Sequence, residues 1–212
     1  MRSETYVHDM DEILAEKEKY AKEFAEGNEN LEKALLCLWG KGLTTTACCA
    51  GHPVEETEEY INYNNPAITF YFDDDYEELV RLISSLDKNN IINIDFFVGS
   101  ELKTVSIQGI KERTNEFFID MCKDNNIIDE NIKKILDLMK STELTGDTEI
   151  PATISIYIKY KDGNIDFVGL STIDKSIADK IKQHFKCEEY NYCDIKHYSF
   201  KMEDLDFINY FN

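Results

Sequence analysis

The chain has few basic residues and few of the residues that interrupt regular structure. Its 212 residues include 23 Lys and Arg against 42 Asp and Glu, which gives a formal net charge of −19. Only three prolines and nine glycines are present, and 42% of the residues are hydrophobic. This composition excludes a disordered or collagen-like chain and favours a folded globule. At this length the chain forms one large domain or two small ones, and either buries a substantial core.

Long hydrophobic runs are also absent from the sequence. No uncharged apolar stretch reaches the roughly 18 residues that a membrane-spanning helix needs. The N-terminus lacks the basic and then apolar pattern of a signal peptide. Six cysteines are too few for a disulfide scaffold in a chain of this length. We therefore expect a cytoplasmic protein with reduced thiols and without membrane contact.

The shortage of Lys and Arg bears directly on the partners of this protein. Nucleic-acid binding rests on phosphate contacts from clustered basic residues, so free nucleic acid is not expected as a direct partner. A strongly acidic surface instead attracts basic proteins, including those that have a nucleic-acid-binding groove. Solubility alone is the alternative explanation of the charge. The oligomeric state stays open.

The acidic residues are concentrated in one part of the chain. Between Gly42 and Val80 there is no Lys or Arg, and this span holds nine acidic residues: Glu55, Glu56, Glu58, Glu59, Asp73, Asp74, Asp75, Glu77 and Glu78. We predict that these nine side chains bind a basic partner in the manner of a nucleic-acid mimic. The alternative for the last five is capping of the helix that follows, because anions stabilise a helix N-terminus. Their spacing matches no calcium-binding loop.

The most chemically versatile stretch is residues 44–53, Thr-Thr-Thr-Ala-Cys-Cys-Ala-Gly-His-Pro. Its threonines and small apolar residues favour a half-buried strand, which the glycine and proline end. Successive strand residues point to opposite faces, so Cys48 and Cys49 do not share a face unless the chain bends. We predict Cys48, Cys49 and His52 as catalytic residues, with a thiol nucleophile and an imidazole base, or as ligands of a small molecule or metal. A buried thiol and a surface histidine are the alternative.

A family resemblance rests on the same stretch. Residues 42–52, followed by Tyr60-Ile61-Asn62-Tyr63, resemble short uncharacterised proteins of clostridial genomes and their phages that carry a Cys-Cys-small-Gly-His signature. More distantly, they are similar to the Ser/Cys-rich Ser-Gly-Arg motif of the tRNA wybutosine-synthesis methyltransferase family, which implies S-adenosylmethionine and tRNA as ligands. His52 stands where that family has Arg, and Thr and Ala replace most of its serines. The resemblance covers residues 30–110.

A second group of metal-binding residue types lies near the C-terminus. His184, Cys187, Cys193 and His197 are spaced so that four ligands surround one zinc ion, and thiolate with imidazole is a ligand set that zinc prefers. The alternative is a strand packed through its aromatic residues, among them Tyr190 and Tyr198. The signatures of phosphate-binding loops, dinucleotide sites, metalloproteases and serine hydrolases are absent, so no cofactor is predicted apart from zinc.

Hydrophobic periodicity predicts an α+β fold with mainly antiparallel sheets and helices packed on one face. We expect a charged helical arm over residues 1–27, an α+β subdomain over 28–111 that carries the Cys-Cys motif, and a second over 112–212. In the first subdomain, Asn30 is expected to cap a helix, and Ile92, Ile94, Phe96 and Val98 are expected to form the buried face of a strand. Asp162-Gly163 predicts a hairpin turn in the second. The two halves form one sheet or two.

Two functions are consistent with these features. The first is an interaction protein of phage or mobile-element type that inhibits a basic nucleic-acid-handling protein, as anti-CRISPR proteins do. The second is an enzyme or ligand-binding protein built on Cys48, Cys49 and His52, which acts on a nucleotide, a modified base or a metal. Thiol activation needs an electropositive setting, and this part of the chain is acidic. The first hypothesis is therefore favoured.

Overall fold

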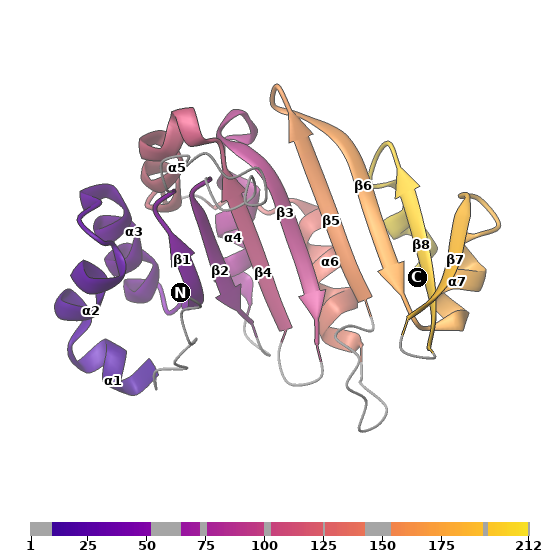
Figure 1. Cartoon of the computed structure of the whole chain (residues 1–212), viewed down its shortest axis with the longest axis horizontal. Coiled ribbons are helices and arrows are strands. Elements are labelled where there is room, and N and C mark those ends of the chain that lie inside the picture. Colours follow the sequence, from indigo (N-terminus) through magenta and orange to yellow (C-terminus); the bar gives the residue numbers. More distant parts are fainter. Residues whose placement is uncertain are drawn as a thin grey trace.

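The computed structural model describes residues 10–51, 65–72, 76–99, 103–124, 126–142, 154–192 and 195–211. The described strands form one eight-stranded antiparallel sheet in the order β1-β2-β4-β3-β5-β6-β8-β7. Helices α4, α6 and α7 lie behind this sheet in Figure 1, and α1 to α3 lie beyond the edge strand β1. The predicted α+β class is confirmed.

The described strands are β1 (Thr44–Cys49), β2 (Ala67–Tyr71), β3 (Ile91–Val98), β4 (Lys103–Gly109), β5 (Ile154–Lys161), β6 (Asn164–Thr172), β7 (Cys187–Tyr192) and β8 (Ile195–Met202). The described α-helices are α1 (Met10–Ala15), α2 (Lys17–Phe24), α3 (Glu29–Gly40), α4 (Glu77–Ser85), α5 (Thr114–Met121), α6 (Glu130–Ser141) and α7 (Lys175–Ile181). Short 3-10 helices are η2 (Lys88–Asn90), η3 (Lys111–Arg113) and η4 (Asp206–Tyr210). Among the helices described, none is long and apolar enough to cross a membrane.

The two halves of the sheet repeat one chain order. The first half runs β1, β2, α4, β3 and β4, and the second runs β5, β6, α7, β7 and β8. In each half the last strand pairs between the second and third strands, which gives the orders 1-2-4-3 and 5-6-8-7. Because β3 pairs with β5, residues 28–111 and 112–212 each contribute four described strands to one continuous sheet.

The helices that the structure describes cover one face of the sheet. On β5, Ile154, Ile156 and Ile158 are fully buried, whereas Ser155 and Tyr157 between them are only half-buried. The same alternation follows from the two-residue period of a strand and directs buried side chains of the other strands towards the helices. These side chains are Ile68 and Phe70 on β2, Ile94, Phe96 and Val98 on β3, Val105 and Ile107 on β4, Val168 and Leu170 on β6, and Tyr198 and Phe200 on β8. The opposite face, here called the open face, carries polar and aromatic side chains.

Two sequence predictions about local structure need correction. Helix α3 is capped by Asn28, not Asn30, because the Asn28 side chain accepts hydrogen bonds from the backbone N–H groups of Asn30 and Leu31, both at 3.0 Å. A cap residue needs an extended backbone ahead of the first turn, and Asn28 has one. Ile92 does not share the buried face of β3, because the register shifts between Ile91 and Asn93 and moves Ile92 onto the open face.

The Asp162-Gly163 hairpin and the N-terminal helices agree with simple local rules. Asp162 and Gly163 both have positive φ, at 51° and 77°, as a two-residue turn between antiparallel strands requires. Helix α2 packs on α3 of the same chain, with Tyr20 and Ala21 buried. The charged helices therefore extend the core beyond β1, although their hydrophobic stripe is thin.

A close approach of β4 to α5 leads to the first prediction. A Cβ atom at Gly109 would lie 2.5 Å from Cγ of Phe117, whose ring is fully buried. We expect Gly109→Ala to lower the free energy of unfolding by about 1–3 kcal/mol, because the buried ring has no space to move into. Urea unfolding followed by circular dichroism measures this change.

Gly40, at the end of α3, provides the matched control. No heavy atom lies within 4 Å of a Cβ built there, and its φ is not positive. Gly40→Ala is expected to change stability by less than about 1 kcal/mol, in the stabilising direction. Equal destabilisation by the two substitutions would show that contact with Phe117 is not the cause.

Candidate functional site

The two adjacent cysteines lie on opposite faces of β1, as the sequence predicts. Cys48 pairs with the fully buried Ile68 and faces the helices, and its thiol donates to the carbonyl of Phe24 at 3.9 Å. Cys49 faces the open side, where its sulfur accepts the backbone N–H of Gly51 at 3.4 Å. His52 lies outside the described residues. The structure therefore places one of the three candidate catalytic groups against the core.

The surroundings of Cys48 oppose a nucleophilic role for its thiol. Burial, followed by the neighbouring Cys49 and the charge of Glu26, raises the pKa of Cys48 to about 11. A thiol nucleophile needs the opposite shift, because the thiolate is the reactive form. Cys48 thus has the properties of a small apolar core residue.

Two of the four C-terminal candidate zinc ligands, Cys187 and His197, lie on opposite faces of the sheet. Cys187 pairs with Phe200 on the helix-covered face. His197 pairs with Tyr190 on the open face, and their rings stack with centroids 5.1 Å apart. His184 stacks on Tyr210 at 4.2 Å.

Cys193 lies outside the described residues, so zinc binding stays a prediction. Within the described ranges, no group of three or more His, Cys, Asp or Glu side chains is arranged to hold a metal ion.

Glu77 and Glu78 belong to the first turn of α4, where acidic side chains stabilise the helix. Arg81, one turn later, forms ion pairs with both glutamates, and its Nη2 lies 2.5 Å from the Glu77 carboxylate. Arg81 therefore compensates one of these two negative charges within the helix. The other predicted partner-binding residues, Glu55, Glu56, Glu58, Glu59 and Asp73 to Asp75, lie outside the described residues.

Strand register locates the strand ends from which several acidic segments of the chain continue. Tyr71, Val98, Lys103, Ile154 and Ile195 all lie at one end of the sheet. These strand ends, here called the acidic end, adjoin segments 73–75, 100–102, 143–153 and 193–194. The four segments contain eight Asp and Glu and no Lys or Arg. The segment with Glu55 to Glu59 instead connects the opposite ends of β1 and β2.

The distribution of charge between described and remaining residues is uneven. The described residues contain 28 Asp and Glu against 22 Lys and Arg, and the rest of the chain contains 14 acidic residues against one Arg. The described residues therefore carry a formal charge of −6, and the remaining residues carry −13 of the total of −19. This asymmetry is much stronger than the overall composition indicates.

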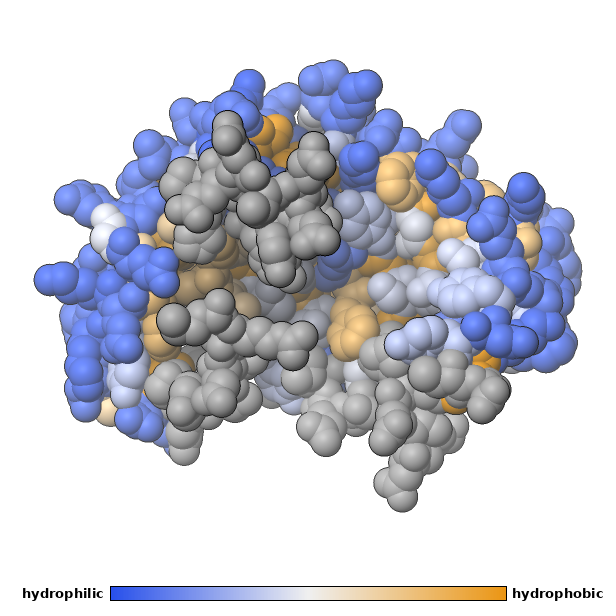
Figure 2. Space-filling model, viewed as in Figure 1, coloured by the Kyte–Doolittle hydropathy of each residue, from blue (hydrophilic) through white to orange (hydrophobic). Residues whose placement is uncertain are grey.

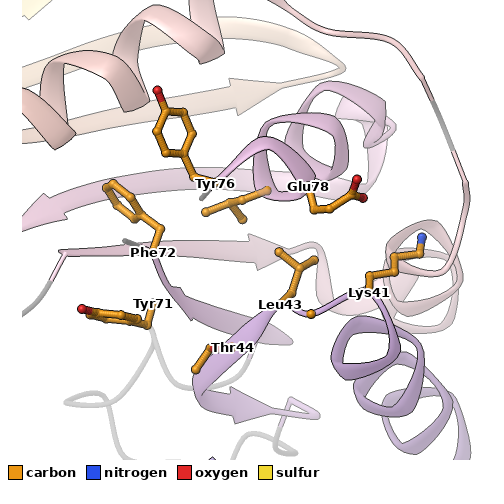
Figure 3. A pocket seen from close by; sticks show the side chains of 9 residues that line it. Lys41, Leu43, Thr44, Tyr71, Phe72, Tyr76 and Glu78 are labelled. Carbon is orange, nitrogen blue, oxygen red and sulfur yellow. The ribbon is translucent and has the colours of Figure 1, made fainter. Parts of the chain in front are cut away.

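A hollow of about 310 Å³ opens at the acidic end, between the α3–β1 turn, the end of β2 and the start of α4. Figure 3 shows Tyr71, Phe72 and Tyr76 on one side of it and Lys41 and Glu78 on the other. Tyr71 is 38% exposed, and the Tyr76 hydroxyl donates to the carboxylate of the α6 residue Asp137. Burial, with that hydrogen bond next, raises the pKa of Tyr76 to about 12.

A second hollow, of about 400 Å³, lies on the open face over β2 to β5. Figure 2 shows mildly polar and hydrophobic side chains over the middle strands of this face and strongly hydrophilic ones around its edge. This open-face hollow is lined by Asn65, Ala67, Ile92, Asn93, Asp95, Ser106, Gln108, Tyr157 and Lys159. Its volume is in the range of small-molecule sites. Sequence reasoning identified the strands that build it but not the convergence of their polar residues.

Asp95 lies at the centre of the open-face hollow, between Ser106 on β4 and Tyr157 on β5. Burial raises its pKa to about 6. In the described part of the chain, no cationic side chain or hydrogen-bond donor pairs with its carboxylate. A partly desolvated carboxylate without a partner is costly to the fold, and such groups are concentrated at functional sites.

The residues around Asp95 are held by hydrogen bonds. The side-chain amide of Asn93 donates to Gln108 Oε1 at 2.8 Å and to the Tyr157 hydroxyl at 3.0 Å. Burial, and less strongly the charge of Asp95, raise the pKa of Tyr157. The Tyr157 phenol is therefore neutral, and its own O–H remains available to donate. The hollow thus combines one anionic acceptor with fixed amide and hydroxyl groups from three neighbouring strands.

The lysine that lines this hollow is directed away from Asp95. Lys159 Nζ lies 3.9 Å from the Asp166 carboxylate and 5.6 Å from the centroid of the Phe167 ring. Lys201 also lies over the Phe167 ring, at 4.4 Å. Both cations therefore cluster around Phe167 on β6, two strands away from Asp95 on β3.

The chain matches no protein-family model, no curated protein and no solved structure in the comparisons made. The resemblance carried by residues 42–52 therefore stays a prediction. S-adenosylmethionine and tRNA are ligands that this resemblance alone implies. The observations that bear on function are the two hollows and the distribution of charge along the chain.

The Cys48 thiol leads to a prediction about reactivity. With a pKa of about 11, only about one Cys48 thiol in a thousand is ionised near pH 8. We expect alkylation of Cys48 by iodoacetamide, mapped by mass spectrometry, to be slow near pH 8 and to rise about tenfold per pH unit up to about pH 10. Unfolding in urea should restore ordinary reactivity. A rate in the folded protein that levels off near pH 8 would contradict a buried, protonated thiol.

The Asp95 carboxyl leads to a prediction about stability and pH. Its folded-state pKa of about 6 lies above the ordinary value of 3.8 for an aspartic acid, so the folded state binds the extra proton, and stability falls as pH rises through this interval. Relative to Asp95→Asn, the wild-type free energy of unfolding should decrease by about 1 kcal/mol between about pH 5 and pH 7. Urea unfolding of both proteins measures the difference.

The exposed Glu188, on the same sheet face, serves as the control for this prediction. Glu188→Gln should leave the wild-type pH dependence unchanged in that interval. If Asp95→Asn follows the same curve as the wild-type protein, the Asp95 carboxyl is not desolvated.

Proposed function

We propose that this protein binds a basic, nucleic-acid-handling protein in the cytoplasm and inhibits it by occupying its nucleic-acid groove. The observation that carries the proposal is the acidic end, where four segments with eight acidic residues and no basic residue adjoin neighbouring strand ends. A rigid sheet gives these segments closely spaced points of attachment. The partner is expected to have a basic groove that otherwise holds phosphates.

Electrostatics supports a macromolecular partner more strongly than a small one. Fields from several like charges add over distances up to the Debye length, about 8 Å in physiological salt, and accelerate encounter with a surface of opposite charge. The framework of 28 acidic and 22 basic residues adds little net charge of its own. Attraction should therefore be directional and should orient the partner towards the acidic end.

The hollow at the acidic end supplies contacts of a different kind. Tyr71, Phe72 and Tyr76 form its aromatic wall, and Lys41 on the other side is held by Asp124 at 2.9 Å. Aromatic side chains are enriched at protein interfaces because they bury a large area with little loss of conformational entropy. Charge would thus orient the partner, and this hollow would provide the desolvated contact.

The alternative enzyme function receives less support from the site. Cys48 faces the core with a raised pKa, which removes one of the two thiols from consideration as a nucleophile. A ligand-binding function is favoured instead by the open-face hollow, where Asp95 lacks a partner in the described part of the chain. That activity is separate from partner inhibition.

Charge reversal tests the proposed function. The assay follows displacement of fluorescent duplex DNA from a panel of purified basic DNA-binding proteins and nucleases. We expect the wild-type protein to displace DNA from its partner, less so at higher salt. The variant with Asp73, Asp74, Asp75 and Glu101 changed to Lys should be at least about tenfold weaker, because these residues belong to the segments at the acidic end.

Two further variants with the same change in charge serve as controls. Reversal of the exposed Glu18, Glu23, Glu29 and Glu203 should leave displacement within about twofold of wild type, because these residues lie elsewhere on the surface. Reversal of Glu55, Glu56, Glu58 and Glu59 should cause a smaller loss than reversal at the acidic end. If all three variants weaken displacement equally, only net charge matters and the proposed surface is wrong.

A further inference from the structure

We infer that the open-face hollow is a binding site for a guanidinium group, with Asp95 as its anionic partner. This inference goes beyond inhibition of a basic protein, because it concerns a different face of the sheet from the acidic end. The hollow holds about 400 Å³, which exceeds what a single guanidinium group and its alkyl chain need. It is built on neighbouring strands in the interior of the sheet.

The surroundings of Asp95 indicate which charge a ligand of the open-face hollow should carry. Asp95 lies in the hollow between Ser106 and Tyr157, and no described cation or donor compensates its carboxylate. Lys159, the only lysine that lines this hollow among the described residues, is paired with Asp166 at 3.9 Å. A cationic ligand would relieve the desolvation of Asp95, whereas an anionic ligand would increase it.

The side chains around Asp95 also indicate the shape and the hydrogen-bonding groups of the ligand. Three strands contribute acceptors and aromatic surface: Asp95 and Asn93 on β3, Gln108 on β4 and Tyr157 on β5. A guanidinium group is planar, has five N–H donors in a fork, and stacks on aromatic rings. An ammonium group is a compact, strongly hydrated charge that loses more hydration on entry. The arrangement of a carboxylate beside amide oxygens and a tyrosine ring therefore favours guanidinium.

Hydrogen bonds already hold the side chains around Asp95 in fixed positions. Asn93 Nδ2 bridges Gln108 and Tyr157, and the Thr69 hydroxyl donates to Ser106 Oγ at 3.1 Å. These hydrogen bonds fix the side chains around Asp95 before any ligand arrives. A preorganised acceptor set loses little side-chain entropy on binding, which raises affinity for a small ligand.

Binding to defined probes tests the inference. Methylguanidinium, free arginine and the peptide Gly-Arg-Gly are titrated into the isotope-labelled full-length protein, and backbone amide shifts of β3, β4 and β5 are followed by NMR. We expect saturable shifts at Asp95, Gln108 and Tyr157. Tighter binding of the peptide would identify an arginine side chain of a protein as the source, and tighter binding of free arginine would identify a small molecule. Both outcomes support the site.

Substitutions at and near the carboxylate make the test specific. Asp95→Asn should weaken binding at least about tenfold, and so should a change from about pH 7 to pH 5, because Asp95 becomes protonated. Glu188→Gln, on the same face but outside the hollow, should bind as the wild type does. The fingerprint spectrum of Asp95→Asn shows that this variant is folded.

Three results would overturn the inference. The first is the absence of saturable shifts for every guanidinium probe up to about 10 mM, a concentration that detects very weak affinity. The second is binding that Asp95→Asn leaves unchanged. The third is a loss of selectivity for guanidinium. Equal binding of Gly-Lys-Gly would show that the site accepts any cation, and tighter binding of guanosine would show that it binds a nucleobase. These probes contain no basic protein, so failure of probe binding would not affect the proposed inhibition through the acidic end. Failure of the DNA-displacement assay would likewise not affect this binding site.

Discussion

The structure depends on one constraint: a continuous antiparallel sheet that is covered by helices on one side only. Side chains of a strand alternate between the two faces, so the residues that fill the core, such as Ile94 and Ile156, determine which residues face outward. Asp95 and Tyr157 are the outward neighbours of those core residues. Burial of one face thus brings polar residues from three strands together on the other.

The junction of the two halves is also the position of the open-face hollow. The first half has the strand order β1-β2-β4-β3 and the second has the corresponding order β5-β6-β8-β7. The halves join where β3 pairs with β5. Asp95 and Asn93 lie on β3, and Tyr157 and Lys159 lie on β5. The hollow therefore exists only when both halves are folded and paired. The shift in register between β3 and β4 adds Ile92 to the lining of this hollow.

The protein contains two kinds of acidic group with different physical consequences. Glu77 and Glu78 are exposed, lie at a helix N-terminus and form ion pairs with Arg81, so they stabilise the fold slightly. Asp95 is half-buried in a hollow where no described cation pairs with it, and the burial that raises its pKa makes its charge unfavourable to folding. An arrangement that opposes folding is retained more readily where it serves binding. Asp95 combines this property with a defined cavity.

The sequence by itself determined the charge asymmetry, the order of helices and strands, the α+β class and the opposite orientation of Cys48 and Cys49, because these follow from composition and local periodicity. The tertiary structure decided what depends on register and long-range pairing. It selected Asn28 over Asn30 as the cap of α3, placed Cys187 and His197 on opposite faces, and joined the halves into one sheet. It also brought Asp95, Gln108 and Tyr157 together. No local pattern contains that information, since residues from three strands become neighbours only when hydrogen bonding fixes their register.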